Sequence, residues 1–308
     1  MTSAGDHPAG CLPTRWRDIP SHALGDTEGE RLPEGLPPVT DAHVHLFPDR
    51  LFAAIWKWFE AHGWPIRYPL PTPEVLEFLF SRGIQRVVAL HYAHKPGMAR
   101  ALNTYMAGLC AAEPRITGLA TVFPGEDGAA DILSEAFTAG LRGVKLHCHV
   151  QAFSPDDPQL WPIFQACAER GFPLVMHAGR EPASPAYPVD PHLLCSADRV
   201  EAVLRDWPRL KLCVPHLGAD EYAAYERLLT RYDNLWLDTT MAVAGYFPGE
   251  TPWRLVQARP ERVLYGTDFP NLPYAWDREL KRLVSDAGLS DEALAQVLSG
   301  TAEALYGP

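Results

Sequence analysis

The 308-residue sequence contains no apolar run that approaches the roughly 18 residues needed to span a membrane. Its six cysteines stand singly, with no C-x-x-C pair, and no segment near the N-terminus resembles a signal peptide. No basic run offsets the acidic excess, and the formal net charge is −11. We therefore expect a cytoplasmic protein with reduced thiols that binds neither membranes nor nucleic acid.

Two nucleotide-binding signatures are also missing. No G-x-G-x-x-G follows the first expected strand, and no G-x-x-x-x-G-K-[ST] occurs anywhere in the chain. What is present is an ordinary globular mixture with 47% hydrophobic and 21% charged residues, which excludes a disordered or coiled-coil chain. We expect the partner to be a small-molecule substrate, and the sequence leaves a homo-oligomer open.

Two segments of different character divide the chain. Residues 1–38 are rich in Gly, Pro, Asp and Glu and lack a periodic apolar pattern, which predicts an irregular N-terminal extension. Residues 39–308 contain the periodic apolar segments and are expected to form a single folded domain.

Short runs rich in Val, Ile and Leu alternate with segments of helical periodicity after residue 38. They recur at intervals of about 32 residues, which is the length of one βαβ unit. Eight such units in series predict an α/β fold of the (β/α)₈ TIM-barrel type rather than an open sheet. The expected strands cover residues 40–46, 86–91, 116–123, 143–149, 173–177, 210–216, 235–239 and 262–268.

Histidines stand at the carboxyl ends of these expected strands. His43 and His45 are separated by one residue, so both side chains lie on the same face of the first strand. His177, His216 and Asp268 close the fifth, sixth and eighth strands. In a barrel all five side chains converge on the face where active sites are built. A buried carboxylate beside several imidazoles would be costly without a cation, so the pattern predicts a metal site.

These motifs resemble those of a known family. Asp41-x-His43-x-His45, His177, His216-x-Gly218 and Tyr265-Gly266-Thr267-Asp268 are similar, in order and spacing, to the amidohydrolase superfamily. The resemblance extends from about Thr40 to the C-terminus. It is to the branch of TIM-barrel metal-dependent hydrolases that also contains aminocarboxymuconate-semialdehyde decarboxylase.

The resemblance implies a set of ligands and a catalytic group. His43, His45, His177 and Asp268 would bind one divalent ion, for which Zn²⁺ is expected and Mn²⁺ or a second ion are alternatives. His216 would stand beside the ion as an acid/base or carbonyl-polarising group, and Asp268 would also carry a proton.

The fourth strand admits two interpretations. Lys145, His147 and His149 alternate with apolar residues and are expected to share one face. In binuclear relatives a lysine on this strand is carbamylated and bridges two metals, in which case His177 and His216 would serve the second ion. In the mononuclear interpretation Lys145 contacts Asp268 or substrate, and both histidines are substrate or supporting groups.

Residues beyond the strand ends could form the substrate pocket. Arg180 follows His177 on the active-site face and could bind a substrate carboxylate in bidentate fashion. His91 and His94, after the second strand, could line the pocket. Aromatic residues in the connection after the first strand could form an apolar wall; they are Trp56, Trp58, Trp64 and Tyr68.

Three functions remain open at this point. The first is a hydrolase that cleaves an ester, lactone or amide bond of a small carboxylated substrate. In this reaction the ion would lower the pKa of a bound water toward about 7, Asp268 would take a proton from that water, and His216 would stabilise the oxyanion. The second is a non-oxidative decarboxylase of an aromatic or unsaturated carboxylic acid that uses the same ligands. The third is a barrel that binds a small molecule without turnover. The presence of every expected metal-binding residue argues against this third function.

Overall fold

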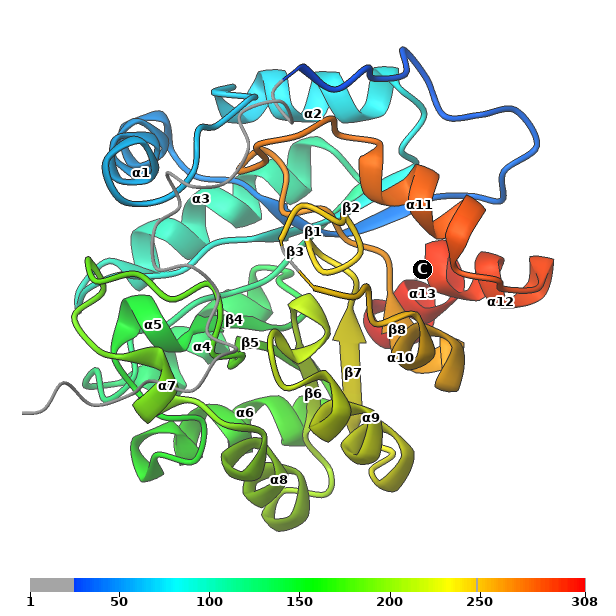
Figure 1. Cartoon of the computed structure of the whole chain (residues 1–308). Coiled ribbons are helices and arrows are strands. Elements are labelled where there is room, and N and C mark those ends of the chain that lie inside the picture. Colours follow the sequence, from blue (N-terminus) through cyan, green and yellow to red (C-terminus); the bar gives the residue numbers. More distant parts are fainter. Residues whose placement is uncertain (1–24, 248, 308) are drawn as a thin grey trace, which may run out of the picture.

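The computed structural model describes residues 25–247 and 249–307, in which parallel strands occupy the centre and helices surround them (Figure 1). The strands are β1 Thr40–His45, β2 Arg86–Leu90, β3 Ile116–Gly118, β4 Val144–His147, β5 Pro173–His177, β6 Lys211–Val214, β7 Leu235–Asp238 and β8 Val263–Leu264. Each lies within one of the expected ranges, so the eight predicted strands are confirmed, although β3 and β8 are much shorter than predicted.

Helices connect the successive strands, as a barrel requires. The longer ones are α1 Asp49–His62, α2 Thr72–Ser81, α3 Ala99–Ala112, α4 Ala129–Thr138, α6 Trp161–Arg170, α8 Ala197–Asp206, α9 Tyr222–Arg231 and α11 Arg278–Asp286. The shorter ones are α5 Cys148–Gln151, α7 Pro191–Leu194, α10 Trp253–Ala258, α12 Asp291–Ala295 and α13 Thr301–Tyr306. No helix in the described ranges is long and apolar enough to cross a membrane.

The strands form a ring with two seams. Strands β1–β2–β3 form one parallel sheet and β4–β5–β6–β7–β8 form another. A parallel bridge between Ala120 and Val144 joins β3 to β4, and one between Val44 and Phe269 joins β1 to the segment after β8. Backbone hydrogen bonds reinforce the second seam, since Ala42 N donates to Tyr265 O (2.9 Å) and His45 N donates to Phe269 O (2.8 Å). The predicted TIM barrel is confirmed.

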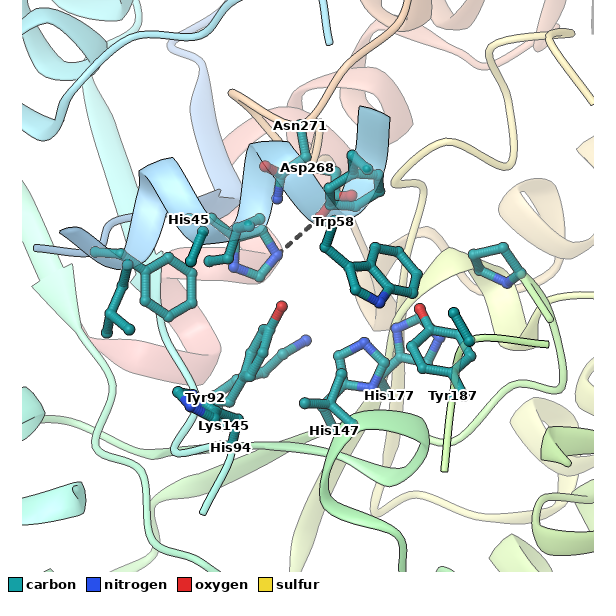
Figure 2. Close-up of a pocket in the computed structure, with 18 of the residues that line it drawn as sticks. His45, Trp58, Tyr92, His94, Lys145, His147, His177, Tyr187, Asp268 and Asn271 are labelled. Carbon is teal, nitrogen blue, oxygen red and sulfur yellow. Dashed lines mark ion pairs between the residues drawn. The ribbon is translucent and has the colours of Figure 1, made fainter. Parts of the chain in front are cut away.

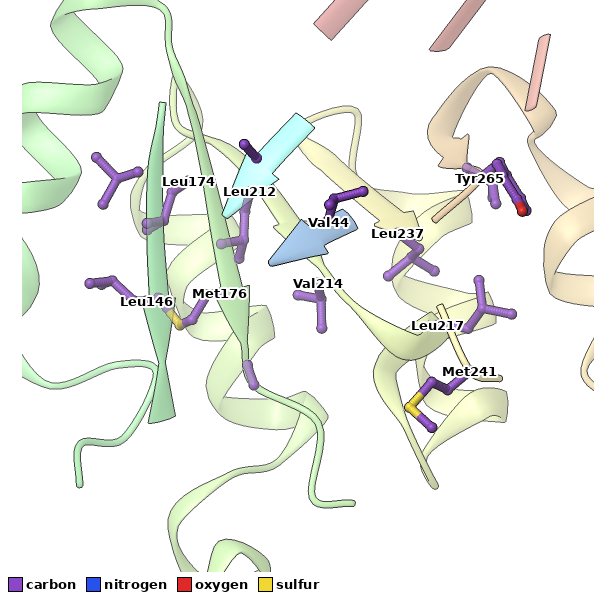
Figure 3. Packing of buried hydrophobic residues seen from close by; sticks show 14 of the residues in the cluster. Val44, Leu146, Leu174, Met176, Leu212, Val214, Leu217, Leu237, Met241 and Tyr265 are labelled. Atoms are coloured by element: carbon purple, nitrogen blue, oxygen red, sulfur yellow. The ribbon is translucent and has the colours of Figure 1, made fainter. Parts of the chain in front are cut away.

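Alternation along the strands separates two apolar clusters. In β5, Leu174 and Met176 belong to the large cluster between the strands and the helices (Figure 3), whereas Val175 belongs to a smaller cluster inside the barrel. Ala302 and Leu305 of α13 also join this inner cluster. Apolar side chains thus fill the lower interior, which leaves the carboxyl ends of the strands for polar groups.

Part of the predicted N-terminal extension, residues 1–24, lies outside the described residues. Residues 26–39 form neither helix nor strand. They bind the barrel through the ion pair of Asp26 with Arg278 (2.7 Å) and through Gly29 O, which accepts a hydrogen bond from Trp276 Nε1 (3.0 Å). Residues 26–39 therefore pack against the domain and are held there by specific polar contacts.

Candidate metal centre

The carboxyl ends of β1 and β8 bring three predicted ligands together. Asp268 Oδ1 lies 2.9 Å from His45 Nε2 (Figure 2). It also lies 3.4 Å from His43 Nε2, and all three side chains are buried. Ligand atoms of the three residues lie within 4.8 Å of one another, a spacing that one metal ion could bridge. We call these residues the β1/β8 cluster.

Asp238, at the end of β7, orients the first of these ligands. Its Oδ2 accepts a hydrogen bond from His43 Nδ1 (2.8 Å), and its Oδ1 accepts from His216 N (3.0 Å). Burial acts to raise the pKa of Asp238, but His43, His216 and the contact with Thr240 together outweigh it, so the pKa lies below its usual range and the carboxyl is ionised. The carboxylate–histidine pair thus fixes the tautomer of His43, as is usual around protein metal sites.

This tautomer tests whether a cation fits the cluster. Burial lowers the pKa of His43 to about 4, so the ring is neutral near pH 7 and carries its single proton on Nδ1. His43 Nε2 then presents a lone pair to Asp268 Oδ1 at 3.4 Å. Two acceptors that face each other in a buried site repel, and a cation between them would convert the repulsion into coordination. The residues present therefore fit a divalent metal.

Asp41 ties the same strand end to the β8 loop. Its carboxylate accepts hydrogen bonds from His43 N (3.1 Å), Thr267 N (3.1 Å) and Thr267 Oγ1 (2.6 Å). Asp268 itself has a left-handed backbone (φ 76°), a conformation that is uncommon outside glycine, and its N–H donates to His43 O (2.9 Å). The backbone of the cluster is thus held from both strands.

A second cluster stands across the cavity, made of His147, His149 and His177, with ligand atoms also within 4.8 Å of one another. The predicted fourth metal ligand, His177, belongs here: its ring stacks on that of His147 with centroids 4.1 Å apart. The structure therefore divides the expected four-ligand set between two clusters. Whether His177 binds the same ion stays a prediction.

The prediction that His149 lies on the fourth strand is wrong. Strand β4 ends at His147, and Cys148–Gln151 forms the short helix α5. The side chain of Gln151 accepts from His147 N (2.8 Å) and donates to Ala93 O (2.8 Å), so the backbone turns where the alternating pattern suggested continued extension. His149 Nε2 consequently faces Gly179 O (2.8 Å), yet its ring still reaches that of His177, 4.6 Å away between centroids.

His216 is linked to His177 by a hydrogen bond. Thr240 O lies 2.9 Å from His216 Nδ1 and can only accept, so this nitrogen carries a proton. Burial lowers the pKa of His216, so the ring is neutral and its Nε2 accepts from His177 Nδ1 (3.1 Å). His177 Nε2 is then left with a lone pair and has no hydrogen-bond partner within the described residues.

Lys145 projects from β4 into the space between the clusters (Figure 2). Its side chain is fully buried, and Nζ has no hydrogen-bond partner in the described part of the chain. Burial lowers the pKa of Lys145 to about 8, while the nearby Asp238 and Asp268 favour the charged form. The amine is therefore largely protonated near pH 7 but is not neutralised by a direct ion pair.

A cavity of about 310 Å³ opens onto both clusters. Lys145, His147, His177, His216 and Asp268 line it, together with His45 and the predicted pocket residue His94. Much of the remaining wall is aromatic: Phe47, Trp58, Phe59, Trp64, Tyr92 and Tyr187. Of the aromatic residues expected to form a wall, Trp58 and Trp64 line the cavity, whereas Trp56 and Tyr68 do not.

Neither of the predicted substrate-binding residues lines this cavity. The Arg180 guanidinium forms a bidentate contact with Asp220, with Nε to Oδ1 at 2.8 Å and Nη2 to Oδ2 at 2.9 Å, and also pairs with Glu221 at 3.4 Å. His91 is fully buried behind the cavity wall, and burial lowers its pKa to about 3. The Arg180 guanidinium is occupied by carboxylates near the surface and His91 lies in the interior, so substrate binding by either residue stays a prediction.

Comparison with known proteins agrees with this architecture. The amidohydrolase family profile matches residues 40–307. The chain belongs to the amidohydrolase family. The family assignment covers the entire barrel and agrees with the resemblance in the strand-end motifs. A search of curated proteins finds no match to the sequence.

Solved structures share the barrel at low sequence identity. An uncharacterized TIM-barrel protein from Bordetella bronchiseptica is 20% identical, with a TM-score of 0.66 over 87% of this chain and 98% of that one. A 5-carboxyvanillate decarboxylase from Novosphingobium aromaticivorans, complexed with manganese and 4-hydroxy-3-methoxy-5-nitrobenzoic acid, is 18% identical, with a TM-score of 0.62 over 92% and 99%. A 2,6-dihydroxybenzoate decarboxylase from Rhizobium is 15% identical, with a TM-score of 0.59 over 88% and 98%.

Sequence reasoning missed Asp238 and the tyrosines of the cavity. Asp238 lies beside the end of the predicted seventh strand, much as Asp268 lies at the end of the predicted eighth. Its position near a strand end could therefore have indicated a place in the site. Tyr92 directly follows the predicted second strand, which placed it at the correct end of the barrel. Tyr187 lies in the long connection after β5, where no sequence pattern indicates which side chains turn inward.

Proposed function

We propose that this protein is a metal-dependent hydrolase of a small carboxylated ester, lactone or amide. The observation that carries the proposal is the facing pair of acceptors, His43 Nε2 and Asp268 Oδ1, beside His45 and at the edge of an enclosed cavity. A cavity of about 310 Å³ is at the small end of ligand pockets, which supports a small substrate.

His43, His45 and Asp268 would hold the ion, and His177 is the proposed fourth ligand because its Nε2 lone pair is unpaired. A bound divalent ion such as Zn²⁺ or Mn²⁺ supplies Lewis acidity and makes water more acidic. Asp238 keeps His43 in the ligating tautomer.

Asp268 is the proposed general base. Burial acts to raise its pKa, but His45, His43 and His216 together outweigh burial, and the pKa lies below its usual value. An ionised carboxylate accepts a proton from water and returns it to the leaving group. His216 Nε2 is the ring atom of that residue that can take up a proton, which fits an acid/base role at the same cavity.

Decarboxylation of an aromatic carboxylic acid is the second candidate. The aromatic wall favours it, since Trp58, Tyr92 and Tyr187 line the cavity and offer apolar surface to a planar ring. Two of the similar structures are decarboxylases of aromatic acids, and one of these was solved with manganese and a nitrobenzoic acid. The same ligand cluster would serve, with an acid delivering a proton to the ring carbon as CO₂ leaves.

One substrate panel distinguishes the two reactions. Aryl esters, carboxylated lactones and hydroxybenzoic acids are incubated with protein loaded with Zn²⁺ or Mn²⁺, and acid release and CO₂ are measured in parallel. Hydrolysis predicts acid release from the esters or lactones without CO₂. Release of CO₂ from the benzoic acids alone would replace the proposal by the second candidate, and no turnover in any metal-loaded sample would contradict both.

A further inference from the structure

Lys145 is the single lysine or arginine among the described residues that line the cavity. Its Nζ is buried and has no hydrogen-bond partner in the described structure, although Asp238 and Asp268 are near enough to influence its charge. A buried ammonium group without a direct partner is costly, and proteins retain such groups where a ligand completes the site. An anion from outside the chain would give Nζ the partner that it lacks.

The surroundings of Lys145 restrict the shape of that anion. In Figure 2 its amine points into the space between Tyr92 and His147, whose rings meet edge to face with centroids 5.1 Å apart. Trp58 and Tyr187, which also line the cavity, stack directly on each other with ring centroids 5.1 Å apart. A flat group that lies against these lining rings gains apolar contact while one of its edges reaches the amine.

We propose that Lys145 is the carboxylate anchor of the site and that the substrate is a planar aromatic monocarboxylate. Its ring packs against the aromatic residues that line the cavity, and its carboxylate accepts a hydrogen bond from Lys145 Nζ. The proposal rests on the proposed function for its reactive end, which must reach the β1/β8 cluster. Lys145 thus takes the carboxylate-binding role expected for Arg180, which is paired with Asp220 and does not line the cavity.

The charges of the cavity favour one carboxylate over two. Lys145 is one fixed cation, and Asp268 is an acid on the opposite side of the same cavity. A second carboxylate on the ligand would find no further Lys or Arg among the described lining residues, and the ion proposed at the β1/β8 cluster is needed for the reactive end of the substrate. Substrates with a single acid group and a neutral hydrolysable or ring substituent therefore fit best.

The test measures binding rather than turnover. Chelator-treated protein, which has no metal to compete for the carboxylate, is titrated with 4-fluorobenzoate and with the neutral, isosteric 4-fluorobenzamide by ¹⁹F NMR. We expect the carboxylate to bind about 10- to 100-fold more tightly, as for a hydrogen bond between charged groups. Lys145→Met should remove that preference and change the Kd of the benzamide less than about twofold.

Arg180→Met is the matched control, because it also replaces a cation by methionine but at a residue outside the cavity lining; it should keep the full preference. If Lys145→Met still prefers the benzoate over the benzamide, or binds both probes more weakly to the same extent, Lys145 does not anchor the carboxylate. If Lys145→Met does not fold, crystals of the unaltered protein with 4-bromobenzoate decide. The bromine signal should lie toward the aromatic wall with the carboxylate on Nζ, and a carboxylate bound elsewhere would contradict the proposal.

Failure of the proposed function gives a different result. If no ester, lactone or benzoic acid is turned over by the metal-loaded protein but the carboxylate preference depends on Lys145, the anchor stands and the reaction is wrong. If turnover occurs while the preference does not depend on Lys145, the reaction stands and the anchor is wrong.

Discussion

The two sides of the cavity carry opposite kinds of polar group. On the β1/β8 side, the carboxylates of Asp41, Asp238 and Asp268 contact the backbone or rings of the histidines and fix their positions. On the β4/β5 side, no ion pair to a carboxylate forms within the described residues, and Lys145 Nζ and His177 Nε2 remain without hydrogen-bond partners. The first side is organised in advance to attract a cation, and the second presents a charge and lone pairs that the protein itself does not satisfy.

The largest expected effect is on the acidic side. Asp268→Asn removes both a ligand charge and the proposed base, so metal retention should weaken and kcat should fall by at least about 10⁴-fold. Elemental analysis after dialysis and kcat at saturating metal measure the two effects. Metal content and kcat both near those of the unaltered protein would remove Asp268 from the site.

His216→Asn should lower kcat by roughly 10² to 10⁴, the effect of losing one acid/base or oxyanion-stabilising group. Metal content should stay near that of the unaltered protein, and KM should change less than kcat because the lost interaction strengthens in the transition state. Loss of metal as readily as in His177→Asn would instead make His216 a ligand and favour the binuclear arrangement.

A smaller effect is expected at Asp238, which acts through His43 and does not touch the cavity. Asp238→Asn should weaken metal affinity by about 10- to 100-fold, as for other groups that orient a ligating imidazole. Competition with a chromogenic chelator measures the affinity. Since excess metal refills a weakened site, kcat should recover at high metal concentration, and a kcat that does not recover would give Asp238 a direct catalytic role.

The smallest expected effect is at Arg180. Because its guanidinium pairs with Asp220 and Glu221 in partly exposed positions, Arg180→Met should change kcat/KM less than about twofold and cost at most about 1 kcal/mol of stability. Steady-state kinetics and urea unfolding check these values. A loss of kcat/KM beyond tenfold with unchanged stability would return Arg180 to the substrate-binding residues.

The sequence predicted the two sides unequally well. His43, His45 and Asp268 were found because strand periodicity and the common end of parallel strands place them together without any detail of loops. His149 was found as a site residue for an incorrect reason, since the Gln151 side chain ends β4 early and no period of two reveals this. The ion pair of Arg180 could not be predicted because its partner, Asp220, is 40 residues away in another loop.

Packing in the interior was predictable for similar reasons. The buried alternation of Leu174 and Met176 against Val175 follows from the period of a strand alone. Ser290 precedes α12, and its hydroxyl caps the helix by accepting from Ala293 N (3.2 Å). Helix α12 nevertheless changes at Gln296 into the π-helical turn Gln296–Gly300. There Val297 O accepts from Tyr265 N (2.9 Å), a tertiary contact that local propensity does not encode.

The most direct measurement is anomalous diffraction at the metal edge from crystals of the unaltered protein grown with Zn²⁺ or Mn²⁺. The account predicts one peak per chain, bounded by His43 Nε2, His45 and Asp268. A peak among His147, His149 and His177 with none at the β1/β8 cluster would contradict it.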